Sequence, residues 1–126
     1  MPLYLHDGFD LDRFSKFVSP RKDFVVQDHH SYFVFTPSDH QQSASQHTGN
    51  VQGGVSTSLN TVADQLRRNL IVGEWSCSLT SESLNNEKDP NQAQRTFCEA
   101  QMNVYSNTTA GWAFWGASEF PSHIYI

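Results

Sequence analysis

The sequence predicts an α/β domain built on a parallel sheet. Short apolar runs alternate with segments whose apolar residues recur at three- and four-residue spacing, so strand and helix follow one another four times, with the last helix absent. The clearest strand, Asn69–Glu74, contains three consecutive aliphatic residues, as is typical of buried strands in parallel sheets. A chain of 126 residues is one domain at most.

Each predicted element has a local signal. Asp10 caps the first helix, and Asp89 with Pro90 begins the last one. The predicted order is strand 2–6, helix 11–18, strand 23–28, helix 55–68, strand 69–74, helix 90–105 and strand 110–115. From residue 36 to residue 54 the composition shifts to Ser, Gln, His, Asp and Gly, which predicts a long surface loop. Phe9, Phe14 and Phe17 are predicted to be core residues.

Composition excludes several classes of partner. The net charge is −5 and no Lys/Arg cluster occurs, which argues against nucleic acid and acidic membranes. No stretch approaches the length of a transmembrane helix, and residues 1–7 lack the basic region and long apolar run of a signal peptide. Aromatic residues make up 13% of the chain, and their flat faces suit the stacking of sugar rings.

Two possible covalent features remain open at this point. A Cys77–Cys98 disulfide would close a loop of about twenty residues and contribute about 3 kcal/mol on the chain-entropy model, but two reduced thiols fit the sequence equally well. Asn107-Thr108-Thr109 is the sole glycosylation sequon of the chain, and Asn107 is its possible acceptor.

In a parallel sheet the active groups gather just past the carboxyl ends of the strands. Glu74 stands at such an end, beside Trp75, and is either a carboxylate held for chemistry or a surface or helix-capping Glu. His29 and His30 with Asp28 could bind a metal, but no second cluster completes a ligand set, so neither a metal nor another cofactor is predicted. The strand ends predict a shared rim made of His6, Asp7, His29, His30, Tyr32, Glu74, Trp75 and Trp115.

Four segments together resemble the second half of fungal exo-β-1,3-glucanases of glycoside hydrolase family five. The segments are Leu5-His6-Asp7-Gly8-Phe9, Val25-Val26-Gln27-Asp28-His29-His30-Ser31-Tyr32, Val72-Gly73-Glu74-Trp75-Ser76 and Gly111-Trp112-Ala113-Phe114-Trp115. The resemblance runs from residue 2 to about residue 116. It implies a half (β/α)8 barrel, strands five to eight without the final helix, so that residues 1–126 form a single partial catalytic domain.

The resemblance also implies roles for individual residues. Glu74 is similar to the catalytic nucleophile of the family. His30 and Tyr32 resemble the pair that hydrogen-bonds that nucleophile and the sugar, and Trp115 resembles the platform under the first sugar. His6 and Asp7 lie where the family lines its cleft, without a catalytic role. A retaining glycosidase needs two carboxyl groups about 5–5.5 Å apart, and these assignments supply one of them.

The chain departs from the family at the second carboxyl group. The family takes its acid/base from an Asn-Glu-Pro motif, which is absent here, since Lys88 follows Asn86-Glu87. We therefore expect a retaining β-1,3-glucanase-like protein that is weak or inactive alone. The alternatives are a non-catalytic, lectin-like carbohydrate-binding protein and a truncated fragment without its own activity. The resemblance implies an extracellular or cell-wall location, and the open edges of a half-barrel predict a homodimer.

Overall fold

The computed structural model describes residues 1–116 and has one parallel four-stranded sheet in the order β1-β2-β3-β4. This confirms the predicted α/β class and the strand-helix alternation. The absence of a final helix is a prediction about residues that lie outside the described part. The elements are β1 (Leu3–His6), α1 (Leu11–Val18), β2 (Val25–Ser31), α2 (Pro37–Gln41), α3 (Ala44–Asn50), a π-helical stretch η1 (Val51–Val55), α4 (Ser56–Gln65), β3 (Leu70–Trp75), α5 (Ser81–Leu84), α6 (Pro90–Thr108) and β4 (Gly111–Phe114).

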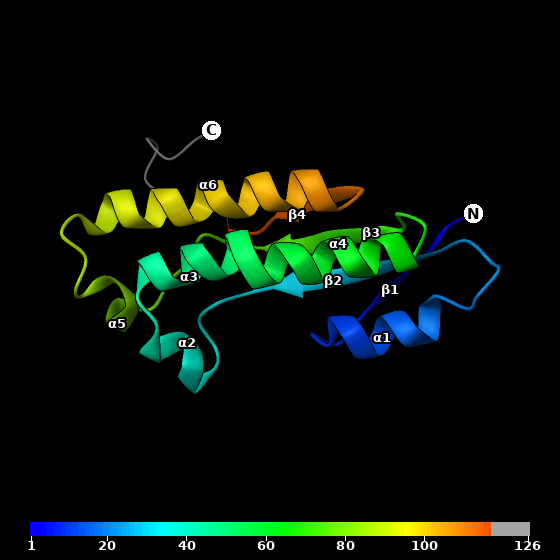
Figure 1. Cartoon of the computed structure of the whole chain (residues 1–126), viewed down its shortest axis with the longest axis horizontal. Helices are drawn as coiled ribbons and strands as arrows, with labels where there is room; N and C mark the ends of the chain where they lie inside the picture. The colour runs from blue at the N-terminus through cyan, green and yellow to red at the C-terminus, as the bar shows by residue number, and fades with distance from the viewer. Residues whose placement is uncertain (117–126) are drawn as a thin grey trace.

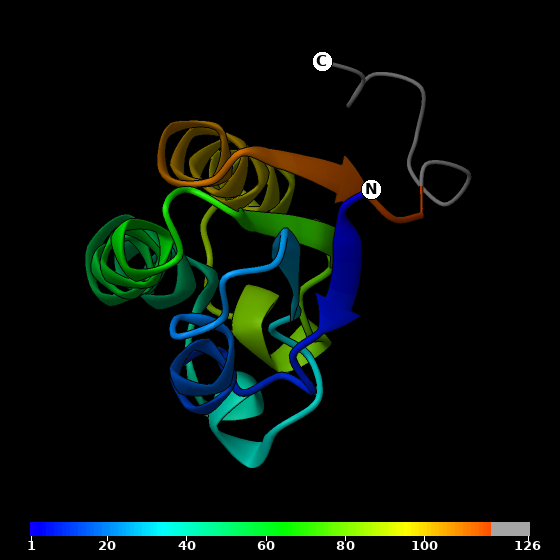
Figure 2. The ribbon, with the colours of Figure 1, turned by 90° about the vertical axis from the view of Figure 1, so that its right-hand side faces the viewer.

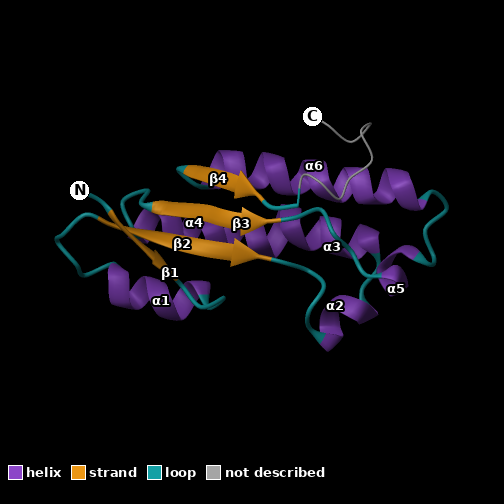
Figure 3. Cartoon of the chain, turned by 180° about the vertical axis from the view of Figure 1, so that it is seen from behind, coloured by secondary structure: helices purple, strands orange, loops and turns teal. Residues whose placement is uncertain are grey.

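The long helices α1, α4 and α6 cover one face of the sheet (Figure 3). The short helices α2 and α5 lie beyond the carboxyl ends of the strands (Figure 1). Viewed along the strands, the sheet is curved, and the side of it away from α1, α4 and α6 has no long helix (Figure 2). The described helices include none with the length and apolar composition needed to cross a membrane.

The core lies between the sheet and the three long helices. Leu59, Val62 and Leu66 of the α4 region, spaced as an amphipathic helix requires, are almost fully buried against Leu70 and Val72 of β3. Trp75 is only 1% exposed and meets the rings of Tyr105, Trp112 and Phe114 edge-on, at centroid distances of 5.4, 5.3 and 5.0 Å. Trp75 therefore joins β3 to β4 and α6.

The caps predicted from the sequence are present. The carboxylate of Asp10 accepts a hydrogen bond from the Arg13 N–H at the start of α1, and Asp89 accepts one from the Gln92 N–H at the start of α6. Cys77 and Cys98 form a disulfide between the segment after β3 and α6. The alternative of two reduced thiols is thereby set aside.

The prediction of a surface loop over residues 36–54 is wrong, because the segment is helical. Thr36 and Ser43 each cap a short helix through a reciprocal capping box. Ala44, His47 and Val51 are buried although the segment is polar overall. α3, η1 and α4 follow one another as a nearly continuous rod (Figure 1).

The prediction that Phe9 and Phe17 belong to the core is also wrong. The two residues are 61% and 55% exposed, because Phe9 lies in the turn after β1 and Phe17 lies on the outer side of α1. Phe14 does pack against the core. Trp112 contacts Trp75 and its indole N–H donates to Ser106 of α6, so this side chain lies toward the helix layer.

Candidate active site

The carboxyl ends of β2 and β3 bring three of the predicted site residues together. The Tyr32 hydroxyl donates a short hydrogen bond to the carboxylate of Glu74. Nδ1 of His30 lies 3.9 Å from the other carboxylate oxygen. In the sheet register His30 stands directly opposite Glu74, just past an irregularity between His29 and His30. That irregularity sets the register that places the two side chains together.

Side-chain alternation along β2 separates two sets of polar residues. Gln27 and Ser31 face the helices, where Gln27 donates to the Leu11 carbonyl and Ser31 accepts from the Tyr105 hydroxyl. Asp28 and His30 lie on the opposite face, the one without long helices, and Tyr32 continues their spacing. The face of the sheet that carries Glu74 is therefore the open one.

The Tyr32 phenol keeps its proton at working pH. Burial raises the pKa of Tyr32 well above its usual value, and the hydrogen bond to Glu74 and its negative charge raise it further. A phenol in this state acts as a hydrogen-bond donor toward the carboxylate of Glu74. Tyr32 is thus suited to hold an ionised Glu74 in a fixed orientation.

His6 contributes a ring to this group. It ends β1, and its imidazole lies 4.1 Å from that of His30 between ring centroids. Phe9 meets both rings edge-on, at 5.2 Å from His6 and 6.0 Å from His30. The rings of His6 and Phe9 are exposed and pack against the partly buried ring of His30, which lies beside Glu74.

Asp7 lies elsewhere than the sequence predicted. Its side chain is fully buried and accepts hydrogen bonds from Nδ1 of His29, from the Gln27 amide and from the Phe9 N–H. Burial raises the pKa of Asp7, but the hydrogen bonds and charge of His29 and the two other donors outweigh it, so the pKa is lowered overall. The hydrogen bonds of Asp7 therefore join the end of β1 to His29 and Gln27 of β2.

Trp115 follows β4 directly, and its backbone N–H donates to the Trp75 carbonyl at 2.8 Å. Its side chain is 64% exposed, so the indole is free to offer a face to a ligand. Among residues 1–116 no group of three or more His, Cys, Asp and Glu side chains is arranged to hold a metal ion.

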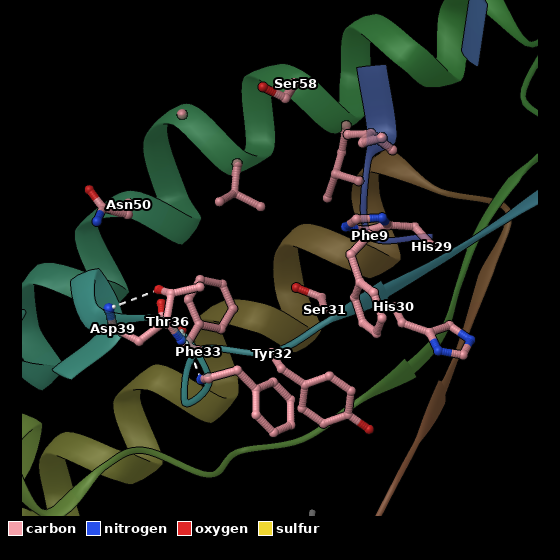
Figure 4. Close-up of a pocket in the computed structure, with 15 residues that line it drawn as sticks. Phe9, His29, His30, Ser31, Tyr32, Phe33, Thr36, Asp39, Asn50 and Ser58 are labelled. Atoms are coloured by element: carbon pink, nitrogen blue, oxygen red, sulfur yellow. Dashed lines mark hydrogen bonds between the residues drawn. The ribbon is translucent and has the colours of Figure 1, made fainter. Parts of the chain in front are cut away.

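A cavity of about 910 Å³ lies beside the site, between the end of β2 and the α3–η1–α4 rod. Its wall is largely apolar and includes Phe9, Phe33 and Phe35, with Asn50 and Ser58 on the helical side. Figure 4 shows the Tyr32 hydroxyl and the His30 ring directed away from Asn50 and Ser58. His30 and Tyr32 also line the cavity, so it adjoins the two residues that contact Glu74.

One participant in the site does not follow from the sequence reasoning above. Nε2 of His30 lies 3.5 Å from a carboxylate oxygen of Asp28, so the ring stands between two carboxylates. The sequence suggests Asp28 only as a possible metal ligand. The two-residue spacing of Asp28, His30 and Tyr32 is the signal that could have grouped them, because alternate strand residues share a face.

Comparison with known proteins agrees with this geometry. The chain is 33% identical over 117 residues to a protein named glucan 1,3-beta-glucosidase 3, from Schizosaccharomyces pombe, and the match covers 91% of the chain. This chain resembles part of a glycoside hydrolase. It spans 24% of the length of that relative. No family model matches the chain. The resemblance to a glucosidase indicated by the four sequence segments is confirmed, and the origin of the chain is glycoside-hydrolase-like.

Proposed function

We propose that this chain is a half (β/α)8 unit of a retaining β-1,3-glucanase type, with Glu74 as its nucleophile. The observation that carries the proposal is the contact of Tyr32 and His30 with the two oxygens of Glu74 on the open face of the sheet. The similarity to a protein named as a glucan 1,3-beta-glucosidase supports β-1,3-glucan as the substrate class. An extracellular or cell-wall location is part of the same proposal.

In this proposal an oxygen of Glu74 attacks the anomeric carbon, and the bond from that carbon to the leaving-group oxygen breaks. Tyr32 and His30 hold the carboxylate during the attack, and Trp115 offers its exposed face to the sugar. The leaving oxygen then needs a proton from a second carboxyl group. One oxygen of Asp28, the carboxylate next to His30, is buried, and the sequence has no Asn-Glu-Pro, so we expect little hydrolysis of natural glucans by the chain alone.

A substrate that needs no acid tests the nucleophile separately. We expect 2,4-dinitrophenyl 2-deoxy-2-fluoro-β-glucoside to label wild-type protein on the peptide that contains Glu74, because dinitrophenolate departs without protonation. Mass spectrometry of a proteolytic digest checks this. Glu82→Gln, at an exposed carboxylate beside His40, is the matched control and should label normally, whereas Glu74→Gln should not label. Absence of an adduct from the wild type, or an adduct on another residue, would contradict the assignment.

The exposed aromatic side chains favour a second candidate, a lectin-like carbohydrate-binding protein. Phe9, Phe35 and Trp115 are 61%, 72% and 64% exposed near the strand ends. Such a protein would bind laminari-oligosaccharides with the same affinity in wild type and Glu74→Gln, and would form no adduct. Titration calorimetry with both proteins separates the two functions.

The exposed edges of the sheet support association of the chain into a homodimer. β1 and β4 are the outermost strands of the described sheet, and Leu3 and Tyr4 on β1 are 49% and 57% exposed. Unpaired edges with apolar side chains favour pairing with a second copy.

We expect the weight-average mass in sedimentation equilibrium to rise toward that of a dimer with concentration. Tyr4→Lys should weaken this association, because a charge on an edge strand opposes pairing. Phe17→Lys, at an equally exposed position on α1, should not weaken it. A monomer at every concentration would exclude the dimer.

A further inference from the structure

We propose that Asp28 is a positioning residue, whose carboxylate rests against Gly73 and holds the His30 imidazole with Nδ1 toward Glu74. The inference rests on the proposed function of Glu74, but its principal test does not use activity. It concerns a residue whose role is to fix the direction of another side chain.

The first observation is the place of the ring. Nε2 of His30 lies 3.5 Å from Asp28 and Nδ1 lies 3.9 Å from Glu74. The side chains of Asp28 and His30 are 23% and 21% exposed, so solvent reaches them only in part. The His6 ring packs against that of His30 and limits its tilt. The two carboxylates lie at the two nitrogens of the ring, one at each.

The second observation is how Asp28 itself is held. A Cβ placed on Gly73 would come within 2.0 Å of Oδ1 of Asp28 and within 2.7 Å of its carboxyl carbon. Real Cβ atoms do not approach so closely, so the carboxylate occupies space that a side chain at residue 73 would need. Gly73 immediately precedes Glu74 in the chain. The strand backbone just before Glu74 therefore also leaves the space that the Asp28 carboxylate occupies beside His30.

The third observation is that Asp28 has no other evident task. Its Oδ1 is buried and has no hydrogen-bond partner among the described residues. A buried carboxylate oxygen without a protein partner is costly, so its position calls for an explanation. The carboxylate of Asp7, which is fully buried, is by contrast held by three donors. Contact with His30 is the interaction that accounts for Asp28 at this position.

The two contacts also set where the ring carries protons. A neutral imidazole has one N–H and one bare nitrogen, and it donates at both nitrogens only when doubly protonated. Asp28 is acceptor-only when ionised, whereas Asn at the same position both donates and accepts. Asp28→Asn keeps the shape of the side chain but replaces the carboxylate next to Nε2 of His30 with a neutral amide. The proton distribution over the His30 ring should then change.

The experiment is long-range ¹H–¹⁵N spectroscopy of the histidine rings in the full chain, with His30 assigned by loss of its signals in His30→Gln. We expect Asp28→Asn to shift both His30 ring nitrogens. Gly73→Ala, which retains Asp28 but displaces its carboxylate, should shift the same two signals. Glu82→Gln is the matched control, since it removes a carboxylate 3.3 Å from His40 and should move the His40 signals alone. Unchanged His30 signals in both Asp28→Asn and Gly73→Ala would overturn the proposal.

A second readout connects the inference to the proposed function. Asp28→Asn should lower the rate of labelling at Glu74 about tenfold, because the negative charge 3.5 Å from Nε2 of His30 is removed. If His30 shifts in the variants but wild-type protein never labels, the positioning role stands and the proposed function fails. If wild-type protein labels at Glu74 but His30 is unmoved in the variants, the proposed function stands and the positioning role fails.

Discussion

Trp75→Ala is expected to lower the free energy of unfolding by about 3–5 kcal/mol, the range for deleting a large aromatic side chain from a core. Trp75 is 1% exposed and contacts three other aromatic rings, on β4 and α6. Its loss leaves a cavity at the junction of sheet and helix. Because domains are stable by only about 5–15 kcal/mol, a large fraction of the stability would disappear. Urea unfolding followed by far-UV circular dichroism measures the change.

Two variants serve as controls for that experiment. Trp112→Ala removes the same side chain from a position that is 38% exposed, and we expect it to cost about 1 kcal/mol. Trp75→Phe keeps an aromatic ring and removes a buried indole N–H that has no hydrogen-bond partner among the described residues, so it should cost much less than Trp75→Ala. Equal losses for Trp75→Ala and Trp112→Ala would show that Trp75 is not the centre of the core.

The strands and long helices could be predicted because their signals are local. Leu70 and Val72 lie in an uninterrupted aliphatic run, and Asp10 and Asp89 are caps that act within one helical turn. The helices at 37–55 could not be predicted in this way. Their burial is limited to a few residues such as Ala44 and Val51, and α3 contacts α6, which is distant in the sequence. A polar segment can be helical when a distant helix covers its few apolar positions.

Some residues of the candidate site could likewise be predicted from the sequence and others could not. Glu74, His30 and Tyr32 could be placed at one rim, because parallel strands bring their carboxyl ends to the same edge. The partners of Asp7 and Asp28 depend on which face of the sheet each side chain takes. Those of Asp28 depend also on Gly73, which lies 45 residues after it in the chain. A single-residue change of register would reverse the faces, so these contacts follow from the assembled sheet and not from strand ends alone.

Gly73→Ala should lower the free energy of unfolding by about 1–3 kcal/mol, because it forces a side chain into occupied space. Gly73 has no positive φ, so Ala suits its backbone and the cost arises from the contact with Asp28. In an Asp28→Ala background that contact is absent, and the same change should be neutral or stabilising by up to about 1 kcal/mol, since Ala restricts the unfolded chain more than Gly.

The double-mutant cycle of these two residues therefore separates steric contact from backbone strain. Unfolding of wild-type protein, Gly73→Ala, Asp28→Ala and the double variant in urea gives the coupling energy directly, and we expect about 1–3 kcal/mol. Gly8→Ala is the control for strain, because Gly8 has φ of +63° and open space where a Cβ would stand, so its cost should not depend on Asp28. A coupling near zero would mean that Gly73 is kept for its backbone and that Asp28 does not rest on it. A large coupling means that the Asp28 carboxylate packs directly on the backbone at residue 73, just before Glu74. Any residue larger than glycine at 73 would then displace Asp28 and, through it, disturb the candidate site.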